Sequence, residues 1–352
     1  MTALAVAIDA RRTQDRPIGG VGRALLGLLP ELARRCDLTV LTDARRESAA
    51  FEVAVDVVPL AAPIGLPEVA WMHGPARRWR RRHPHVFHGT FNALPTGGGG
   101  GPSVVTIHDL SFEVHPEDFG AAKRRVFQVQ ARAAARSADH IVTVSRFSAD
   151  ELIEHYRVAP ERITVITHAV DPGFGPERAD ASHGGRPYVV ALGGARRRGL
   201  EVAVQAWRLV REGGVDVELC TVGGPDLPPE AGLRQLHHLD DAAWASLLAG
   251  AEAFVYPTRY EGFGLPALEA AASGTPVVCA RVASLPEVLG EAAAWCEQPT
   301  SAQIAEQLRA VLTDGALAEH LAAAGLEQAR RAPTWADLAD AHLTVYRRVV
   351  DA

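Results

Sequence analysis

The sequence predicts an α/β protein with two domains, each built around a parallel β-sheet. The chain has 352 residues, a length that favours two domains. Short, continuously apolar segments alternate with longer amphipathic ones, the pattern of buried parallel strands joined by helices. A segment rich in proline, glycine and charge separates two such series. We therefore expect βαβ domains at residues 1–170 and 188–334, a linker at 171–187, and a final helix at 335–352.

The composition excludes several classes of protein. Hydrophobic residues make up 47% of the chain, charged residues make up 22%, and the net charge is −6. These values are ordinary for a globular protein and give no indication of a nucleic-acid partner. No stretch approaches the roughly 20 apolar residues of a membrane span. The cysteines are scattered without metal-type spacing, and the N-terminus has no basic-then-apolar leader, so we expect a cytoplasmic protein.

The first domain opens with an apolar strand at Leu4–Ile8 and a loop that reaches Gly19-Gly20-Val21-Gly22-Arg23. A helix with an apolar stripe then extends to about Arg35. This glycine segment lacks the full GxGxxG dinucleotide pattern. Two interpretations remain open for Gly20 and Gly22: an ordinary strand-to-helix turn, or a close approach of the backbone to a phosphate or acceptor.

Another strand, at Val104–Ile107, ends in His108-Asp109. Ligands of open α/β sheets bind beyond the carboxyl ends of the strands, which makes His108 a candidate for a functional role, although a lone histidine is usually structural. Asp109 either faces a bound substrate or caps the next turn. Asn92, which follows a short strand at 86–88, is a second acceptor-side candidate.

A strongly basic run lies at Arg77–His83. Such a run is most often a solvated helix face. The alternative is contact with an anionic acceptor, or with lipid headgroups at the inner face of a membrane, with Trp79 at the interface.

The second domain restarts the pattern with a strand at 188–192, a Gly193-Gly194 loop and three arginines. Its central motif, YPTRYEGFGLPALEAAASGTPVV, spans 256–278. The motif predicts a strand end, a glycine loop, a helix that stops at Gly274, and a further strand. The amides of a helix N-terminus bind anions, although a plain connector is the alternative.

Two carboxylates frame this loop. Glu261 lies in the loop, and Glu269 lies one turn into the helix, where side chains lean back toward the N-terminus. Amide donors beside two carboxylates suit a nucleotide sugar, in which a diphosphate meets the amides and hydroxyls meet the carboxylates.

EGFGLPALEA followed by SGTPVV resembles the signature of the family-four glycosyltransferases, a retaining group with the GT-B fold. The resemblance implies two Rossmann-like domains that face a cleft, and a C-terminal helix that returns to the first domain. It implies that Glu261 and Glu269 contact the donor sugar and its ribose, and that the amides of residues 262–265 contact donor sugar and phosphate. GGVGR and THDLSFEVHPEDF also resemble family segments, which implies that His108 lies near the donor sugar.

The arginine loop departs from the family pattern. The family carries Gly-x-Leu-x-x-Arg-Lys-Asn, whereas this chain has GGARRRGL, apparently one residue shorter. We expect Arg198 in the lysine-like role and Arg197 as its neighbour, although the register of the loop stays open. Arginine keeps the positive charge but differs from lysine in shape.

The resemblance implies a hexosyltransferase that moves a hexose from GDP-mannose or a UDP-hexose to an acceptor hydroxyl with retention. Since the sequence shows no nucleophile pair like that of retaining glycosidases, we expect same-face attack. The expected acceptor is a carbohydrate, a lipid-linked molecule or a small metabolite. We expect no cofactor and no metal, because no DxD-type site is evident and arginines with helix dipoles supply the positive charge. A sugar-nucleotide epimerase, a phosphorylase or a non-catalytic nucleotide-sugar-binding protein are the alternatives.

The candidate residues fall into three groups. The catalytic candidates are His108, Glu261 and Arg198. The donor-binding candidates are Gly20, Gly22, Gly193, Gly194, Arg197, Arg198, Glu261, Gly262, Phe263, Gly264, Leu265 and Glu269. The acceptor-side candidates are Asp109 and Asn92.

Overall fold

The computed structural model describes residues 4–47, 55–62, 68–95, 97, 99–179, 185–237 and 239–352. The chain divides into two compact units. Unit 1 comprises residues 1–169 and 333–352, and unit 2 comprises residues 170–332. Residues 180–184 of the segment that the sequence suggests as a linker lie outside the described residues.

Unit 1 is built on a seven-stranded parallel sheet in the order β3-β2-β1-β4-β5-β6-β7. The strands are β1 (Ala5–Asp9), β2 (Asp37–Asp43), β3 (Asp56–Leu60), β4 (Val86–Gly89), β5 (Ser103–Thr106), β6 (His140–Thr143) and β7 (Ile163–Val165). The strand order reverses between β1 and β4. Such a switch point places a crevice at the carboxyl edge of a sheet, where ligands bind.

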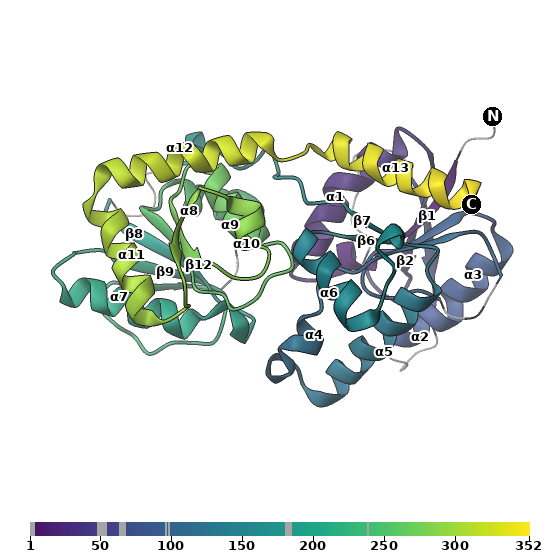
Figure 1. Cartoon of the computed structure of the whole chain (residues 1–352), viewed down its shortest axis with the longest axis horizontal. Helices are drawn as coiled ribbons and strands as arrows, with labels where there is room; N and C mark the ends of the chain where they lie inside the picture. Colours follow the sequence, from purple (N-terminus) through teal and green to yellow (C-terminus); the bar gives the residue numbers. More distant parts are fainter. Residues whose placement is uncertain are drawn as a thin grey trace. The chain divides into compact units, whose positions relative to one another are not determined.

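The helices of unit 1 cover both faces of this sheet (Figure 1). They are α1 (Gly20–Ala33), α2 (Glu68–Trp71), α3 (Arg77–Arg82), α4 (Ser111–Val114), α5 (Ala121–Ser137), α6 (Arg146–Tyr156) and α13 (Trp335–Asp351). Side chains of β1 alternate between the two faces: Val6 and Ile8 join the core under α1 and α13, whereas Ala7 joins the core under α5. This alternation is the period of two expected of a strand.

The last helix, α13, packs on α1 and belongs to unit 1. A Cβ atom added to Gly27 in α1 would lie 2.3 Å from the ring of Trp335. The absence of a side chain at Gly27 therefore lets the two helices approach closely.

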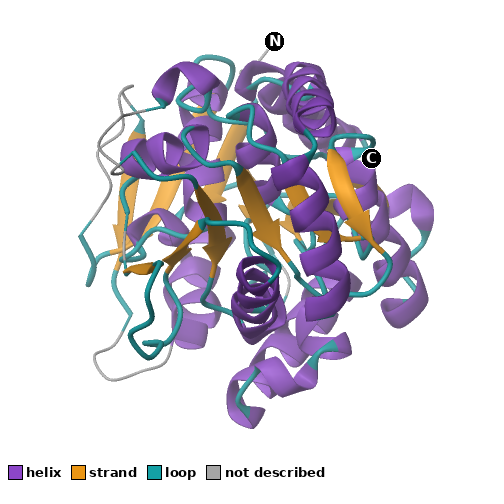
Figure 2. Cartoon of the chain, turned by 90° about the vertical axis from the view of Figure 1, so that its left-hand side faces the viewer, coloured by secondary structure: helices purple, strands orange, loops and turns teal. Residues whose placement is uncertain are grey.

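Unit 2 contains a six-stranded parallel sheet in the order β10-β9-β8-β11-β12-β13, again enclosed by helices (Figure 2). Its strands are β8 (Tyr188–Leu192), β9 (Glu218–Val222), β10 (Leu233–Leu236), β11 (Ala253–Tyr256), β12 (Val277–Ala280) and β13 (Ala293–Cys296). Its helices are α7 (Leu200–Glu212), α8 (Asp241–Ala249), α9 (Leu265–Ala272), α10 (Leu285–Leu289), α11 (Ser301–Thr313) and α12 (Gly315–Arg331). The switch point lies between β8 and β11. The predicted α/β class with two parallel sheets is confirmed.

One predicted boundary is wrong. The segment Gly19–Arg23 is not a loop before the helix, because α1 already begins at Gly20 and only Gly19 stands outside it as the N-cap. The connection from β1 to α1 contains the short 3₁₀ helix at Arg11–Gln14 and the non-helical residues 15–19.

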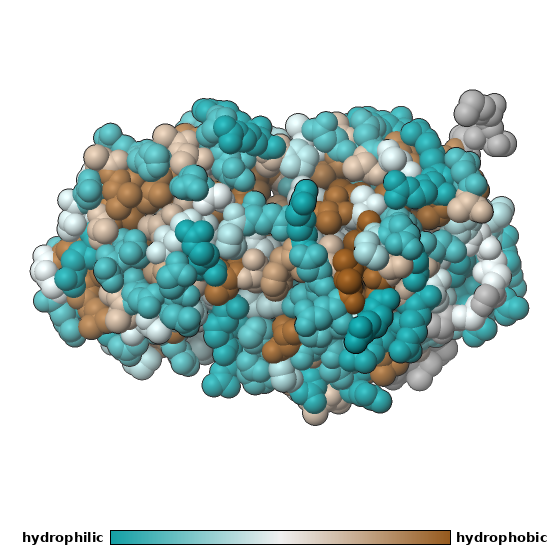
Figure 3. All heavy atoms as spheres, viewed as in Figure 1, coloured by the Kyte–Doolittle hydropathy of each residue, from teal (hydrophilic) through white to brown (hydrophobic). Residues whose placement is uncertain are grey.

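The face of the molecule in Figure 3 is largely hydrophilic, with separate apolar patches. Among the described residues, the exposed large hydrophobic side chains are Val126, Val129, Leu209 and Val350. No helix in the described part of the chain combines the length and the apolar character that crossing a membrane requires.

Candidate active site

The central motif of unit 2 lies at the sheet's switch point. β8 pairs with β11, so the Gly193-Gly194 loop after one strand is beside the 257–264 loop after the other. A Cβ on Gly193 would lie 2.5 Å from the carbonyl oxygen of Gly223, and Gly194 has a φ of 100°. Both positions therefore require glycine, the first for space and the second for its backbone conformation.

Glu261 is buried, with 8% of its surface exposed, and its Oε1 is held from two sides. The hydroxyl of Tyr256 donates a hydrogen bond to Oε1 at 2.5 Å, and Arg198 Nε lies 3.7 Å from the same atom. Ser284 Oγ donates to the carbonyl oxygen of Glu261 at 2.8 Å, which fixes the backbone. No hydrogen bond from the described residues reaches Oε2, so this oxygen is available to a ligand.

Charge in this cluster is balanced. Burial, together with the neighbouring carboxylate of Glu261, raises the pKa of Tyr256 well above its ordinary value, so its hydroxyl stays a donor. Burial alone would lower the pKa of Arg198, but the oxygens of Tyr256 and Glu261 outweigh that effect and raise it. Arg198 is therefore a permanent cation beside a buried carboxylate.

The structure separates the roles of the arginines in the shortened loop. Residues 196–198 form a single 3₁₀ turn. Arg198 donates from Nη1 to the carbonyl oxygen of Gly193 at 3.1 Å and faces Glu261. Arg197 instead donates from Nε to the carbonyl oxygen of Tyr260 at 3.2 Å. Of these two arginines, Arg198 is the one that faces Glu261, and its expected role toward the diphosphate stays a prediction.

Glu269 is more deeply buried than Glu261, at 2% exposure. The indole Nε1–H of Trp244 donates to its Oε2 at 2.8 Å. Trp244 lies in α8, and Glu269 lies in α9, so this hydrogen bond ties two neighbouring helices. The bond satisfies part of the hydrogen-bonding capacity of a carboxylate that burial would otherwise destabilise.

The glycine loop closes onto α9 as predicted. Gly264 is the N-cap residue, with a φ of 93°, and a Cβ there would lie 2.4 Å from Leu285 Cδ2. The amides of Gly264 and Leu265 donate no hydrogen bond within the described residues. Residues 261–264, which include Gly262 and Phe263, are nevertheless all buried, so the loop is less exposed than the sequence suggests.

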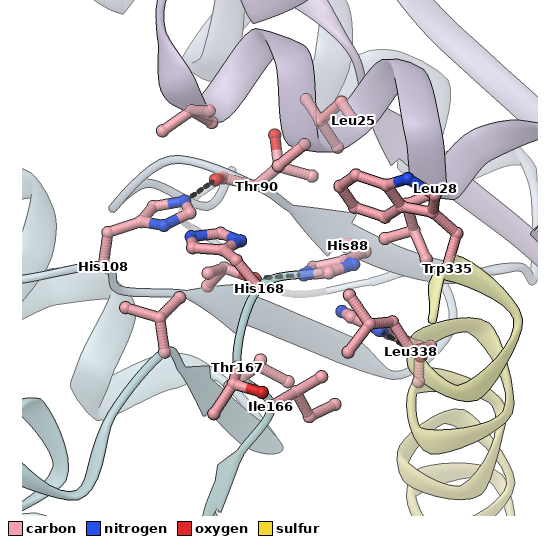
Figure 4. A pocket seen from close by; sticks show the side chains of 16 residues that line it. Leu25, Leu28, His88, Thr90, His108, Ile166, Thr167, His168, Trp335 and Leu338 are labelled. Carbon is pink, nitrogen blue, oxygen red and sulfur yellow. Dashed lines mark hydrogen bonds between the residues drawn. The ribbon is translucent and has the colours of Figure 1, made fainter. Parts of the chain in front are cut away.

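In unit 1, His108 borders a small cavity of about 40 Å³. Its Nε2 lies 2.9 Å from the carbonyl oxygen of Thr90, so Nε2 carries the proton, and its ring stacks on His168 (Figure 4). Burial, assisted by the charge of Arg12, lowers the pKa of His108, which is therefore neutral at pH 7. The cavity is far smaller than the about 300 to 1,000 Å³ typical of ligand pockets.

The two acceptor-side candidates flank His108. Asn92 accepts a hydrogen bond from the backbone N–H of His108 at 3.3 Å and has a φ of 52°. Asp109 accepts from the backbone N–H of Ser111 at 2.9 Å, the capping contact that the sequence analysis weighs against a functional role.

The two glycines that open α1 differ. A Cβ on Gly22 would lie 2.4 Å from the carbonyl oxygen of Arg12, whereas one on Gly20 would meet nothing within 4 Å. Packing against the β1–α1 connection therefore requires glycine at position 22 alone.

The basic run at 77–83 forms α3 and its C-cap, and part of it packs inward. Arg80 donates from Nη2 to the carbonyl oxygen of Gly101 at 2.9 Å, and Trp79 stacks on His83 with ring centroids 4.1 Å apart. These contacts within unit 1 explain the positions of the Arg80 and Trp79 side chains without a lipid partner.

No pattern in the sequence indicates that Tyr256 and Trp244 are the partners of the two carboxylates. Tyr256 was visible only as the end of an apolar strand, and Trp244 lies in another helix. Within the described residues, no group of three histidine, cysteine, aspartate or glutamate side chains could hold a metal ion.

Two family models match the chain. One, described as Glycosyltransferase Family 4, matches residues 18–174, and the other, described as Glycosyl transferases group 1, matches residues 186–314. Together they cover most of both units.

Curated relatives have related names. The O-antigen chain mannosyltransferase B of Escherichia coli is 29% identical in an alignment of 288 positions that covers 74% of this chain and 74% of that protein. The D-inositol 3-phosphate glycosyltransferase 1 of Catenulispora acidiphila is 28% identical in an alignment of 369 positions that covers 94% of this chain and 85% of that protein.

Solved structures share the fold. Sucrose-phosphate synthase from Thermosynechococcus elongatus has a TM-score of 0.78 at 18% identity and covers 99% of each chain. Anabaena Alr3699/HepE, solved in complex with UDP and glucose, has a TM-score of 0.72 at 16% identity, covering 98% of this chain and 99% of that one.

Proposed function

Because the chain belongs to the family-four, group 1 glycosyltransferases and has the GT-B fold, we propose that it is a retaining, metal-independent hexosyltransferase. Its donor is a nucleotide diphosphate sugar, GDP-mannose or a UDP-hexose. Relatives named as mannosyltransferases and a similar fold solved with UDP and glucose support both donor classes. The observation that carries the proposal is the buried Glu261, with one oxygen held by Tyr256 and Arg198 and the other available.

The reaction breaks the bond between C1 of the sugar and the diphosphate oxygen. Positive charge grows on the sugar ring, and negative charge grows on the leaving diphosphate. Donors for that negative charge are already in place in Arg198, Arg197 and the unbonded amides of Gly264 and Leu265. Preorganised donors of this kind usually make the largest single contribution to catalysis. Glu261 Oε2 accepts a hydrogen bond from a hydroxyl of the sugar, and this contact positions C1. The positive charge of the arginines is our reason to propose a metal-independent reaction.

The stereochemistry follows from the acceptor's direction of attack. We propose that the acceptor hydroxyl approaches C1 on the face that the diphosphate leaves, and that the departing phosphate oxygen takes its proton. We propose that the acceptor binds to unit 1, with Asn92 and Asp109 as acceptor-side residues and His108 as a catalytic residue. As a neutral imidazole with its proton on Nε2, His108 keeps Nδ1 as a hydrogen-bond acceptor for a sugar hydroxyl.

Donor identity is tested by thermal shift with UDP, GDP and their hexose derivatives. A ligand that binds only the folded state raises the melting temperature, so a selective stabiliser identifies the base and the sugar. Product analysis then separates the alternatives. Free nucleoside diphosphate with a new α-glycoside indicates retaining transfer, whereas an epimerised nucleotide sugar or a sugar phosphate indicates an epimerase or a phosphorylase. Donor binding without any product indicates a binding protein.

The role of Glu261 is tested with Glu261→Gln. The amide oxygen can still accept from Tyr256, so the fold survives, but the negative charge is lost. We expect release of nucleoside diphosphate from the preferred nucleotide sugar to fall at least 100-fold, about 3 kcal/mol in transition-state stabilisation. Glu252→Gln is the matched control, since Glu252 is exposed and directly precedes β11. Turnover by Glu261→Gln at the control's rate would contradict the proposal.

A further inference from the structure

Hydrogen bonds hold His108 at its backbone and at one nitrogen of its ring. The backbone N–H donates to Asn92 Oδ1 at 3.3 Å, and the carbonyl oxygen accepts from Ser148 Oγ at 3.1 Å. Nε2 donates to the carbonyl oxygen of Thr90 at 2.9 Å. The χ2 torsion of histidine, which sets the tilt of the ring, has only a broad intrinsic preference. Packing against the ring must therefore narrow its orientation.

The tilt of the ring decides the direction of Nδ1. In the proposed reaction, Nδ1 of the neutral imidazole accepts a hydrogen bond from a sugar hydroxyl, and hydrogen bonds weaken steeply when they depart from linearity. Misplacement of a group by about 1 Å can cost roughly 100-fold in rate, even when its cause lies outside the reacting centre. A side chain that limits the tilt of His108 therefore acts on the reaction through His108.

His168 packs nearly parallel to His108. The two ring centroids are 5.8 Å apart and the ring planes differ by 14°, within the range of about 4.5 to 7 Å that favourable ring pairs adopt. Figure 4 shows the two rings next to each other at the small cavity. Phe91 is a second neighbour of His108, at 6.2 Å, but its ring is tilted by 38°. Of these two rings, His168 is the one whose plane matches that of His108.

The backbone that carries His168 comes from a different part of the chain. His168 follows β7 and lies shortly before the chain passes into unit 2. The N–H of Ile166 donates to the carbonyl oxygen of Thr143 at 2.8 Å, so this segment is still attached to the edge of β6. The support for the His108 ring is thus anchored on the sheet and does not depend on the position of His108 itself.

The two stacked rings are uncharged at neutral pH. Burial, with smaller contributions from His108 and His342, lowers the pKa of His168 to about 3, and burial also lowers the pKa of His108. The contact therefore depends on the flat shape of the ring and not on a charge. A phenyl ring at position 168 should preserve it, whereas an aliphatic side chain should not.

We propose that His168 is a positioning residue for His108: its ring sets the tilt of the His108 imidazole and thereby the direction of Nδ1. This assignment rests on the proposed function, in which His108 is a catalytic residue, and it adds to the site of unit 1 a side chain that acts through His108.

NMR on the intact protein measures the order of the His108 ring directly. Histidine labelled with ¹³C at Cε1 gives one signal for each of the 14 histidines of the chain, and His108→Ala identifies the signal of His108 by its loss. We expect the order parameter of this Cε1–H bond to be about 0.85 in the unchanged protein, and to fall below about 0.6 in His168→Leu. In His168→Phe it should stay near the first value. An order parameter that is the same in His168→Leu as in the unchanged protein would overturn the proposal.

His140→Leu is the matched control for the loss of a buried histidine from unit 1. His140 lies in β6, has a pKa that burial lowers to about 4, and contacts the Thr164 hydroxyl at 2.8 Å. This variant should leave the order of the His108 ring unchanged. An equal loss of order in both leucine variants would show a general loosening of unit 1 and would count against His168. His168→Gln, which also lacks a ring, replaces His168→Leu if that variant does not fold.

Turnover links the orientation of the ring to the reaction. In His168→Leu, we expect kcat for release of nucleoside diphosphate to fall about tenfold or more, with KM for the nucleotide sugar changed by less than about twofold. His168→Phe should restore most of the rate. In the His108→Ala background there is no ring to orient, so His168→Leu should cost less than about twofold. A tenfold loss in both backgrounds would show a merely structural role.

The two measurements separate this inference from the proposed function. Turnover of a nucleotide sugar, together with an His108 ring whose order does not depend on the side chain at position 168, would refute this inference alone. Absence of turnover with every nucleotide sugar, together with a His108 ring that loses order in His168→Leu but not in His140→Leu, would refute the proposed function and leave the positioning of His108 by His168 in place.

Discussion

Mild acid should destabilise unit 1 selectively, because His88 and His342 are buried in its core without a negative partner. His88 contacts the Tyr346 hydroxyl through Nδ1 and the Thr106 hydroxyl through Nε2. Burial lowers the pKa of His88 well below its usual value of 6.5 and lowers that of His342 to about 4. Both are therefore neutral in the folded state at pH 5.

The sign follows from proton uptake. Between pH 6.5 and about 4, the unfolded chain binds protons at these histidines and the folded chain does not, so stability falls as the pH falls. At pH 5 each histidine removes about 2 kcal/mol relative to pH 7.5. His140 and His168, whose pKa values burial lowers to about 4 and about 3, act in the same direction. Unit 1 therefore loses at least about 4 kcal/mol, a large part of the 5 to 15 kcal/mol of a typical domain. The carboxylates of Asp43 and Glu113, whose pKa values are lowered, act only at lower pH.

Hydrogen exchange followed by mass spectrometry measures this effect in each unit, since it reports the free energy of opening segment by segment. Peptides from β4 should lose at least about 4 kcal/mol of protection between pH 7.5 and 5, after correction for intrinsic exchange. Peptides from β11 in unit 2 should lose much less, because the described histidines there, His237 and His320, are exposed. In His342→Leu the loss at β4 should be smaller by about 2 kcal/mol. A free energy of opening at β4 that stays constant over this range would refute the reasoning.

Two further substitutions test packing and the second carboxylate. Gly22→Ala should destabilise unit 1 by about 1 to 3 kcal/mol and lower its melting temperature, because the added Cβ would clash with the Arg12 carbonyl. Gly20→Ala is the control in the same calorimetric scan, since a Cβ there meets open space. Trp244→Phe removes the donor to Glu269 and leaves that buried carboxylate less satisfied, at a cost of about 1 to 3 kcal/mol. Its affinity for UDP or GDP, measured by calorimetry, should fall about tenfold or more, and an unchanged affinity would exclude Glu269 from donor binding.

The local signals of the sequence were sufficient for the elements and for the glycine loop. Continuous apolar segments marked the parallel strands, and the spacing of Gly264, Pro266 and Gly274 defined α9 to within one or two residues. The GGVGR segment was misinterpreted because a glycine-rich run usually indicates a loop, whereas here the close approach to Arg12 requires glycine inside a helix.

Contacts between distant segments left no comparable signal. The hydrogen bond from Trp244 to Glu269 joins two helices, and no periodicity in either helix indicates it. The burial of residues 261–264 was also not predictable, because it depends on Leu285 and other side chains from later in the chain. Sequence patterns describe one element at a time, whereas the electrostatics of this site depends on which elements become neighbours.

The burial of Glu261 explains why its partners belong to the same site. A carboxylate that is 8% exposed would be costly if it stood alone, and here Tyr256 and Arg198 both meet Oε1. Arg198 is also held by the Gly193 carbonyl, so its position does not depend on Glu261 alone. In the proposed reaction, the carboxylate that orients the sugar is thus next to the cation that faces the leaving diphosphate. In Glu261→Gln, the Gly193 contact should keep Arg198 in place, so UDP or GDP should still bind. The additional affinity that the attached hexose gives to the nucleotide sugar should disappear.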